Sequence, residues 1–305
     1  MKKYIYILFS LLLCSACNEE DLGESLIDTS TPILTETDLW IRSNYTTPYN
    51  IEVKYRWDNS ELDNTKVLTP PKEEVVRPFL DNMKKIWIDP YTRQGGEDFV
   101  KTYIPKLMVL VGSHNMNSDG SIILGQAEGG RKVTIFDLNY ISFDFEGLDE
   151  HEKEKQLEVI IRTFATMHHE FGHILHQTTA YPVEFKKITP NYIRNWMNYT
   201  NGEARKMGFI SSYSMLNPDE DFAETLSTFL TMSNEAWNAL IDKITIYDEN
   251  YDEDVAASAV AKANIREKEK MIADYMLAAW KVNIYELQTD ITKAINDLYK
   301  LNDSK

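Results

Sequence analysis

His168-His169-Glu170-Phe171-Gly172-His173 is the stretch from which the fold and chemistry of this chain can be worked out. It contains His-Glu-x-x-His, with His169 and His173 four positions apart. On a helix, side chains at i and i+4 lie one above the other, so both imidazoles can reach one metal ion. Glu170 lies about 100° further round the helix, where its carboxylate can take a proton from a water on that metal. The stretch therefore predicts a zinc-binding helix that carries its own general base.

The composition makes this motif informative. The chain has 6 His in 305 residues, and four of them lie between positions 168 and 176. A chance His-Glu-x-x-His is expected in about one such sequence in a hundred. The alternative is a helix whose His side chains are merely exposed or packed.

The helix around the motif is predicted to run from about Asp149 to Thr178. Apolar residues recur on one face at steps of three and four: Leu157, Ile160, Phe164, Met167, Phe171 and Ile174. The opposite face carries the His residues: Arg162, Ala165, Thr166, His169, Gly172, His173 and His176. Because Ala165 and Gly172 are small, we expect room for a metal and a substrate beside this face.

The rest of the chain predicts an α+β fold of the zincin type. Strands are expected at 49–57, 106–112, 121–124 and 132–138, forming a mixed sheet packed on the motif helix. A helix is expected at 75–87, and further helices at 219–232, 235–246, 252–282 and 284–301. We expect one catalytic domain over residues 38–305, with a sheet-rich lobe at about 38–180 and a mainly helical lobe at about 181–305. The edge strand is expected to lie across the motif helix and to bind extended peptide.

The first residues have the pattern of a bacterial lipoprotein signal. Lys2 and Lys3 precede a short apolar run, and small residues lead to Cys17. We expect a signal peptide over residues 1–16, a lipid on Cys17 and a flexible tether over residues 17–37. Plain secretion with Cys17 free and an uncleaved membrane anchor are the alternatives. With Cys14 removed and Cys17 acylated, the mature domain has no disulfide and no Cys-ligated metal.

The charge balance argues against one class of partner. The formal net charge is −16, with 48 Asp and Glu against 32 Lys and Arg. Such a chain is not expected to bind nucleic acid or to adhere to an anionic membrane surface.

Two His side chains need a third protein ligand to form a catalytic zinc site. A His six positions after His173 would supply it in one class, but Thr179 stands there. Glu220 and Glu224 lie at i and i+4 of the helix that begins at Pro218. As in gluzincin peptidases, we expect Glu220 to bind the metal and Glu224 to orient one imidazole.

Alternatives remain open at this point in the chain. Asn217-x-x-Glu220 also fits a helix-capping box, which would occupy the Glu220 side chain. Asp219 and Asp221 are the alternative ligands. His176 lies one turn beyond His173, and we expect it either to contact groups that orient the ligands or to be a packed wall residue.

The motifs also resemble those of known families. His-Glu-Phe-Gly-His followed by Tyr213 and by Glu220-Asp221-Phe222-Ala223-Glu224 is similar to the catalytic domain of anthrax lethal factor. That resemblance implies that Tyr213 hydrogen-bonds the oxyanion of a tetrahedral intermediate. Over most of the chain, the sequence resembles the substrate import-associated zinc metallohydrolase lipoproteins of Bacteroidetes. This family implies a metallopeptidase at the outer membrane, associated with SusC/SusD-type importers.

The expected function is therefore hydrolysis of peptide bonds with one Zn²⁺ ion and a peptide or protein substrate. A lipid-anchored enzyme exposed at the cell surface is the expected location, with the periplasmic face as the alternative. Two other classes of function stay open. One is hydrolysis of a non-peptide amide, because the motif leaves the acyl group unspecified. The other is a non-catalytic, zinc-containing accessory of an importer.

Overall fold

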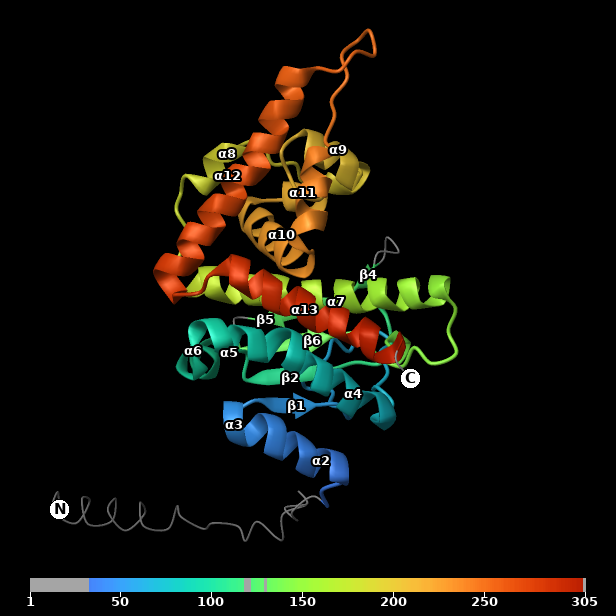
Figure 1. The fold of residues 1–305 in the computed structure, drawn as a ribbon. Coiled ribbons are helices and arrows are strands. Elements are labelled where there is room, and N and C mark those ends of the chain that lie inside the picture. Colours follow the sequence, from blue (N-terminus) through green and yellow to red (C-terminus); the bar gives the residue numbers. More distant parts are fainter. Residues whose placement is uncertain (1–32, 118–121, 129–130, 304–305) are drawn as a thin grey trace, which may run out of the picture. The chain divides into compact units, whose positions relative to one another are not determined.

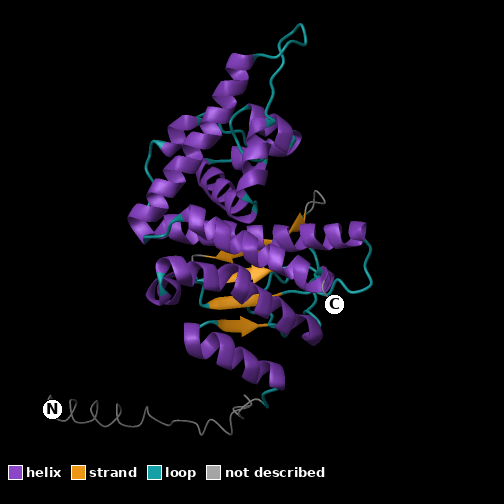
Figure 2. Cartoon of the chain, viewed as in Figure 1, coloured by secondary structure: helices purple, strands orange, loops and turns teal. Residues whose placement is uncertain are grey.

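The structure is a computed structural model that describes residues 33–117, 122–128 and 131–303. The described residues from Glu36 onward belong to one compact unit. The predicted signal peptide, Cys17 and most of the predicted tether lie outside the described residues. Figures 1 and 2 show an α+β architecture in which helices surround a small sheet, as the sequence predicts.

A four-stranded sheet has the order β1-β2-β6-β5. Its strands are β1 (Glu52–Lys54), β2 (Leu107–Leu110), β6 (Lys132–Ile135) and β5 (Gly125–Glu128). The first three are parallel and β5 is antiparallel to β6, so the predicted mixed sheet is confirmed. The predicted strand at 121–124 is only partly present. Ile122–Ile123 forms β4, which pairs with β3 (Asn115–Met116), and the edge strand of the main sheet begins at Gly125.

The predicted helix at 75–87 is present as α4 (Glu73–Met83), continued by the π-helical turn η2 (Lys84–Ile88). Several neighbouring helices were not predicted: α2 (Glu36–Ile41), η1 (Arg42–Thr46), α3 (Thr47–Tyr49), α5 (Asp89–Gly95) and α6 (Glu97–Tyr103). Two of them contain a proline in the first turn, at Pro48 and Pro90. Proline is tolerated there because the first N–H groups of a helix have no partner within the helix.

Helix α7 (Glu150–Thr178) carries the His-Glu-x-x-His motif, close to its predicted bounds. Asp149 caps it, since its side chain accepts a hydrogen bond from Glu152 N at 2.8 Å. The predicted apolar stripe lies in the main core, fully buried from Ile160 to Ile174. Helix α7 lies along the β5 edge of the sheet, so the motif is held between the sheet and the later helices (Figure 1).

The C-terminal half is helical, as predicted. A short 3-10 turn, η3 (Leu138–Tyr140), precedes α7. The elements after α7 are α8 (Phe185–Ile188), η4 (Trp196–Asn198), α9 (Asn201–Lys206), η5 (Tyr213–Met215), α10 (Pro218–Thr231), α11 (Asn234–Asp242), α12 (Val255–Trp280) and α13 (Ile284–Asp303). Helix α13 returns to contact α5 and η2 beside the sheet. Among the described residues, no helix combines the length and the apolar character needed to cross a membrane.

Candidate metal centre

The site forms where α10 crosses α7. An added Cβ at Gly172 would lie 3.6 Å from Ala223 Cα and 3.5 Å from Leu226 Cδ2. These are ordinary van der Waals distances, so α10 packs directly beside Gly172, which corrects the expectation that Gly172 leaves room for a substrate. Ala165, the other small residue, does line a cavity. The close crossing is what brings side chains of α10 within reach of the His residues.

The first turn of α10 directs Glu220 toward α7. Asn217 caps the helix, and its side chain accepts hydrogen bonds from Asp219 N at 2.9 Å and Glu220 N at 3.0 Å. Pro218 occupies the first helical position, where its missing N–H costs nothing. The Glu220 carboxylate faces the imidazoles, whereas in a full capping box it would turn back to Asn217.

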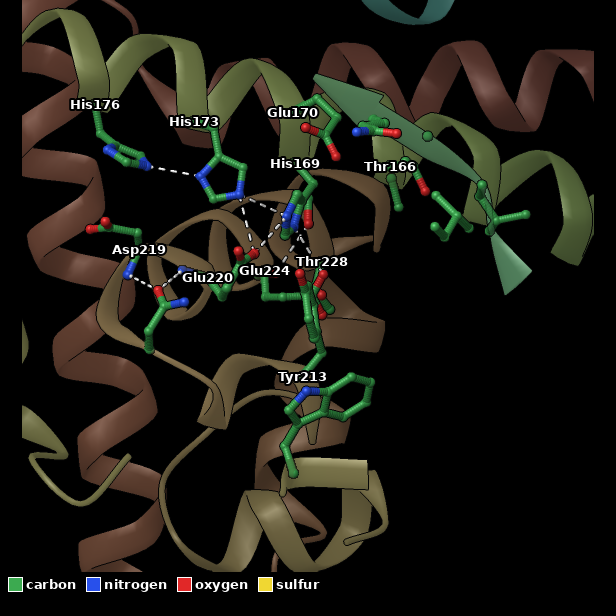
Figure 3. Close-up of a pocket in the computed structure, with 18 of the residues that line it drawn as sticks. Thr166, His169, Glu170, His173, His176, Tyr213, Asp219, Glu220, Glu224 and Thr228 are labelled. Carbon is green, nitrogen blue, oxygen red and sulfur yellow. Dashed lines mark hydrogen bonds and ion pairs between the residues drawn. The ribbon is translucent and has the colours of Figure 1, made fainter. Parts of the chain in front are cut away.

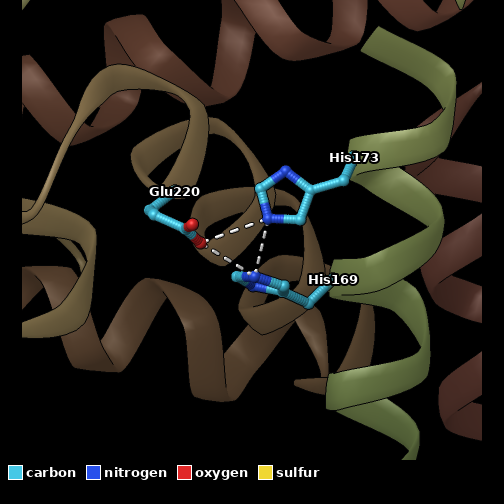
Figure 4. Close-up of side chains that lie close together, drawn as sticks. All are labelled: His169, His173 and Glu220. Atoms are coloured by element: carbon cyan, nitrogen blue, oxygen red, sulfur yellow. Dashed lines mark hydrogen bonds and ion pairs between the residues drawn. The ribbon is translucent and has the colours of Figure 1, made fainter. Parts of the chain in front are cut away.

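Three side-chain atoms converge at this crossing (Figures 3 and 4). His169 Nε2 lies 3.0 Å from His173 Nε2 and 3.0 Å from Glu220 Oε2. His173 Nε2 lies 3.2 Å from the same Glu220 oxygen. The three residues form a group that could hold a metal ion, and they are the three ligands expected from the sequence.

The size and chemistry of this group fit zinc. Ligand atoms of tetrahedral zinc with bonds of 2.0–2.1 Å lie about 3.3 Å apart, close to the 3.0–3.2 Å edges of the triangle. Two imidazole nitrogens and one carboxylate oxygen are a donor set that catalytic zinc uses. A single cation between these atoms would replace three close contacts between electronegative atoms with three bonds.

The electrostatics of the group favour positive charge. Burial lowers the pKa of His169, but the close carboxylates of Glu220 and Glu224, each 3.0 Å from a ring nitrogen, outweigh burial and raise the pKa to about 10. Burial opposes ionisation of Glu220, and its contacts with His169 and His173 nevertheless hold its pKa well below the usual range. The carboxylates of Glu220 and Glu224 stabilise a proton on His169, and the same negative charges also stabilise a divalent cation bound to that imidazole.

Each imidazole has a second contact that fixes its orientation. His169 Nδ1 lies 3.0 Å from Glu224 Oε1, the position predicted to orient a ligand. His173 Nδ1 lies 2.9 Å from His176 Nε2. Burial, followed by the charge of His173, lowers the pKa of His176 to about 4, so its imidazole is neutral at pH 7 and can accept the His173 N–H. Such contacts set which ring nitrogen faces a metal.

The alternative ligands have other partners. Asp221 is fully buried and lies 2.7 Å from Lys268 Nζ, on the side of α10 that faces α12. Asp219 accepts a hydrogen bond from the Tyr181 hydroxyl. Neither residue belongs to the group of three converging atoms.

A cavity of about 1080 Å³ surrounds this group. Its walls come from α7, α10, the β4–β5 segment and the segment from Trp196 to Tyr213. Glu170 lines it beside His169, as the predicted base should. The ring centroid of Tyr213 lies 5.9 Å from that of His169. Burial and the nearby Glu220 charge raise the pKa of Tyr213, so its hydroxyl keeps its proton and can donate a hydrogen bond.

Three residues of the site were not singled out in the sequence. Ser211 Oγ donates a hydrogen bond to Glu224 Oε2 at 2.6 Å. Trp196 packs edge-to-face on Tyr213, with ring centroids 4.9 Å apart. Lys186 lines the cavity. Ser211 lies two positions before Tyr213, and this proximity is the one sequence signal that could have identified it. Trp196 and Lys186 are far from the motifs in sequence and reach the site through tertiary packing.

Comparison with known proteins agrees with this geometry. Residues 31–285 match the family described as "Putative zinc-binding metallo-peptidase", and the chain belongs to that family. It is also similar to a solved structure whose title names a "putative zinc-binding metallo-peptidase from Bacteroides caccae ATCC 43185". The two share 29% identity and a TM-score of 0.68, over 91% of this chain and 98% of the other. A search of curated proteins found no match.

Proposed function

We propose that this chain is a zinc-dependent peptidase of the gluzincin type, in which His169, His173 and Glu220 bind one Zn²⁺ ion. The observation that carries the proposal is the convergence of two imidazole nitrogens and a carboxylate oxygen within 3.0–3.2 Å of one another. Membership of the zinc-binding metallo-peptidase family supports it.

The residues around the ligands supply the remaining parts of the reaction. When bound, Zn²⁺ lowers the pKa of a water molecule and polarises the scissile carbonyl. Glu170 accepts the proton as the water attacks and then delivers it to the leaving amine. Tyr213 donates a hydrogen bond to the oxyanion that forms at the carbonyl. Glu224 and His176 hold the two imidazoles in orientation.

The edge of the sheet supports the expectation of an extended substrate. Strand β5 pairs with β6 on one side, and in the described residues no strand pairs with its other side. An added Cβ at Gly125 would lie 2.5 Å from Thr166 Cγ2, so this edge crosses α7 one turn before Glu170. A peptide paired with β5 would therefore pass in front of Glu170 and the metal ligands.

The location of the enzyme is proposed from the sequence alone. The pattern before Cys17 supports a lipid anchor and an outer-membrane protein exposed at the cell surface. The resemblance to import-associated lipoproteins supports a role beside a SusC/SusD-type importer. Labelling of intact cells with radioactive palmitate, compared between the wild type and Cys17→Ser, tests the anchor.

The variant Glu170→Gln tests the catalytic proposal. It should keep one zinc per chain and reduce peptide turnover by about 10²- to 10⁴-fold, because the general base is lost. Glu158→Gln is the matched control, since Glu158 is exposed on the same helix and lies outside the cavity. Zinc content and cleavage of a peptide library should be measured together. Full activity of Glu170→Gln would contradict the role given to Glu170.

A further inference from the structure

The cavity is long compared with the metal cluster. Along α7 its lining extends from Arg162 through His169 and His173 to His176 and Gln177. Arg162 and His176 are separated by 14 positions, which is about 21 Å along a helix. An extended peptide advances about 3.3 Å per residue, so this length accommodates about six residues. In Figure 3, Thr166 and His176 lie on opposite sides of His169, which places the cluster between the two ends.

Each end of the cavity carries one cation. Arg162 is exposed on the N-terminal side of the cluster, on the same face of α7 as Thr166 and His169. Lys186 is exposed on the other side. Its Nζ lies 5.6 Å from the centroid of the Tyr181 ring, which in turn lies 5.5 Å from the His176 ring. Within residues 33–117, 122–128 and 131–303, neither cation forms an ion pair.

The acidic residues of the cavity have a different distribution. Glu170, Asp219, Glu220 and Glu224 line it around the cluster. Glu220 and Glu224 contact the imidazoles, and Asp219 accepts a hydrogen bond from Tyr181. Burial raises the pKa of Asp137, and the nearby charges of His114 and, more weakly, Arg162 oppose that shift. The Asp137 carboxylate lies 2.6 Å from His114 Nδ1, so His114 and not Arg162 is its contact. The two cations are therefore left to bind anions that enter the cavity.

The formal net charge of the chain is −16, so two cations in one cavity contrast with an otherwise acidic protein and point to the charge of the substrate. At physiological ionic strength the Debye length is about 8 Å, so distant acidic residues are screened and the cavity's own side chains decide which substrate binds. A guanidinium binds a carboxylate through two parallel hydrogen bonds, whereas an ammonium acts as a point charge. Arg162 should therefore discriminate more strongly than Lys186.

We propose that the cavity selects peptides that carry carboxylates on both sides of the scissile bond, with Arg162 and Lys186 as the specificity-determining residues. This inference rests on the proposed peptidase function. Arg162 precedes His169 by seven positions, or about 10 Å of helix, which corresponds to a carboxylate about three residues from the scissile bond. That carboxylate can belong to an acidic side chain or to the peptide's C-terminus.

Matched peptides test this proposal. Starting from a peptide that the zinc-loaded enzyme cleaves, Glu and Gln versions are made at each position up to four residues from the scissile bond. The wild type should cleave the best Glu version about 10-fold faster in kcat/KM than its Gln counterpart. Arg162→Gln should abolish the preference on one side of the bond only, and Lys186→Gln should weaken it on the other. Peptides with a free or an amidated C-terminus distinguish the two sources of the carboxylate.

Two exposed lysines provide controls. Lys155 lies seven positions before Arg162 on α7, and Lys187 adjoins Lys186, but neither lines the cavity. Lys155→Gln and Lys187→Gln should keep the wild-type preference. If Arg162→Gln slows Glu and Gln peptides equally, or if both specificity variants retain the preference, the proposal is wrong.

A binding measurement separates failure of this proposal from failure of the proposed function. Fluorescent Glu and Gln peptides are titrated with zinc-loaded Glu170→Gln, with and without Arg162→Gln, and followed by anisotropy. Even if no peptide is cleaved, charge selection is supported if Glu170→Gln binds the Glu peptide more tightly than the Gln peptide, and if this difference disappears when Arg162→Gln is added. Equal binding of both peptides, or no binding, would overturn it.

Discussion

Helices α7 and α10 each place two adjacent, chemically similar residues in opposite surroundings. His169 and Glu220 point into the cluster of converging atoms, which we call the cluster side. Their neighbours His168 and Asp221 lie about 100° away round each helix and are fully buried, on what we call the core side. On the cluster side carboxylates raise the pKa of His169 to about 10, whereas on the core side burial lowers the pKa of His168 to about 3.

The difference shows that helical rotation decides the role of each residue. One position along a helix is a turn of about 100°, enough to change the partner completely. Asp221 could serve as a metal ligand by residue type, yet it is paired with Lys268, which also donates a hydrogen bond to Gly208 O at 2.9 Å. The buried contacts on the core side stabilise the packing of the helices. That packing brings His169, His173 and Glu220 together on the cluster side.

The largest effect is expected from breaking the core-side ion pair. Lys268→Met leaves the buried Asp221 charge without its partner and should cost about 3–5 kcal/mol in free energy of unfolding. Zinc content per folded chain should stay at one, because the cluster side is unchanged. Chemical denaturation and metal analysis measure both quantities. The double variant with Asp221→Asn should recover part of the loss, and an unchanged stability of Lys268→Met would contradict a structural role for the pair.

Removing the carboxylate on the cluster side should act on the metal and not on folding. Glu220→Ala should weaken zinc binding by more than about 100-fold, because one of the three proposed protein ligands is lost. Asp219→Asn is the matched control and should bind zinc like the wild type. Competition with a chromophoric chelator measures both affinities. Loss of zinc from Asp219→Asn, with Glu220→Ala unaffected, would move the ligand to Asp219.

A smaller effect is expected from the contact behind His169. Glu224→Gln should weaken zinc binding by about 10- to 100-fold, since the Nδ1 partner loses its charge. Ser211→Ala removes the hydrogen bond to Glu224 and the one that Ser211 Oγ accepts from Ser214 N, but it leaves the Glu224 charge in place and should have a weaker effect in the same direction. The same chelator competition measures this series. An equal affinity in all three proteins would show that Glu224 does not orient the ligand.

The smallest effect concerns pH on the core side. The pKa of an unfolded His is about 6.5, and burial lowers that of folded His168 to about 3. Below pH 6.5 the unfolded chain therefore binds a proton that the folded chain does not, and this His reduces stability as the pH falls toward 3. At pH 5.5 the reduction is about 1.4 kcal/mol.

His168→Leu removes this titration. Denaturation of the variant and the wild type at pH 7.5 and 5.5, with a chelator present, compares their losses of stability. The loss between the two pH values should be about 1.4 kcal/mol smaller in the variant. Identical losses would mean that folded His168 titrates with an ordinary pKa.

The parts of the site that follow from local spacing could be predicted from the sequence. The i, i+4 positions of His169 and His173 need only a helix, and the apolar stripe on α7 predicts that helix and its buried face. The C-terminal helices likewise follow from their periodicity. The mixed sheet was predicted, but one of its strands was expected at 121–124, whereas the strand of the main sheet in this region begins at Gly125, because a short apolar run does not show which residues pair.

Other features depend on contacts between distant segments. The choice of Glu220 over Asp219 and Asp221 depends on how α10 is rotated, which is set by Asn217, by the crossing at Gly172 and by Lys268. The helices α3 and α5 were missed because segments of three and seven residues are too short to show an apolar periodicity. The wall residues Trp196 and Lys186 reach the cavity through loops that have no periodic pattern.

The most direct test of the central claim is the position of zinc itself. A crystal grown with one equivalent of Zn²⁺ should be measured on both sides of the zinc absorption edge. We predict one strong anomalous peak between His169 Nε2, His173 Nε2 and Glu220 Oε2, at about 2.0–2.2 Å from each. A peak coordinated by other residues, or no peak at this cluster in crystals that contain zinc, would contradict the account.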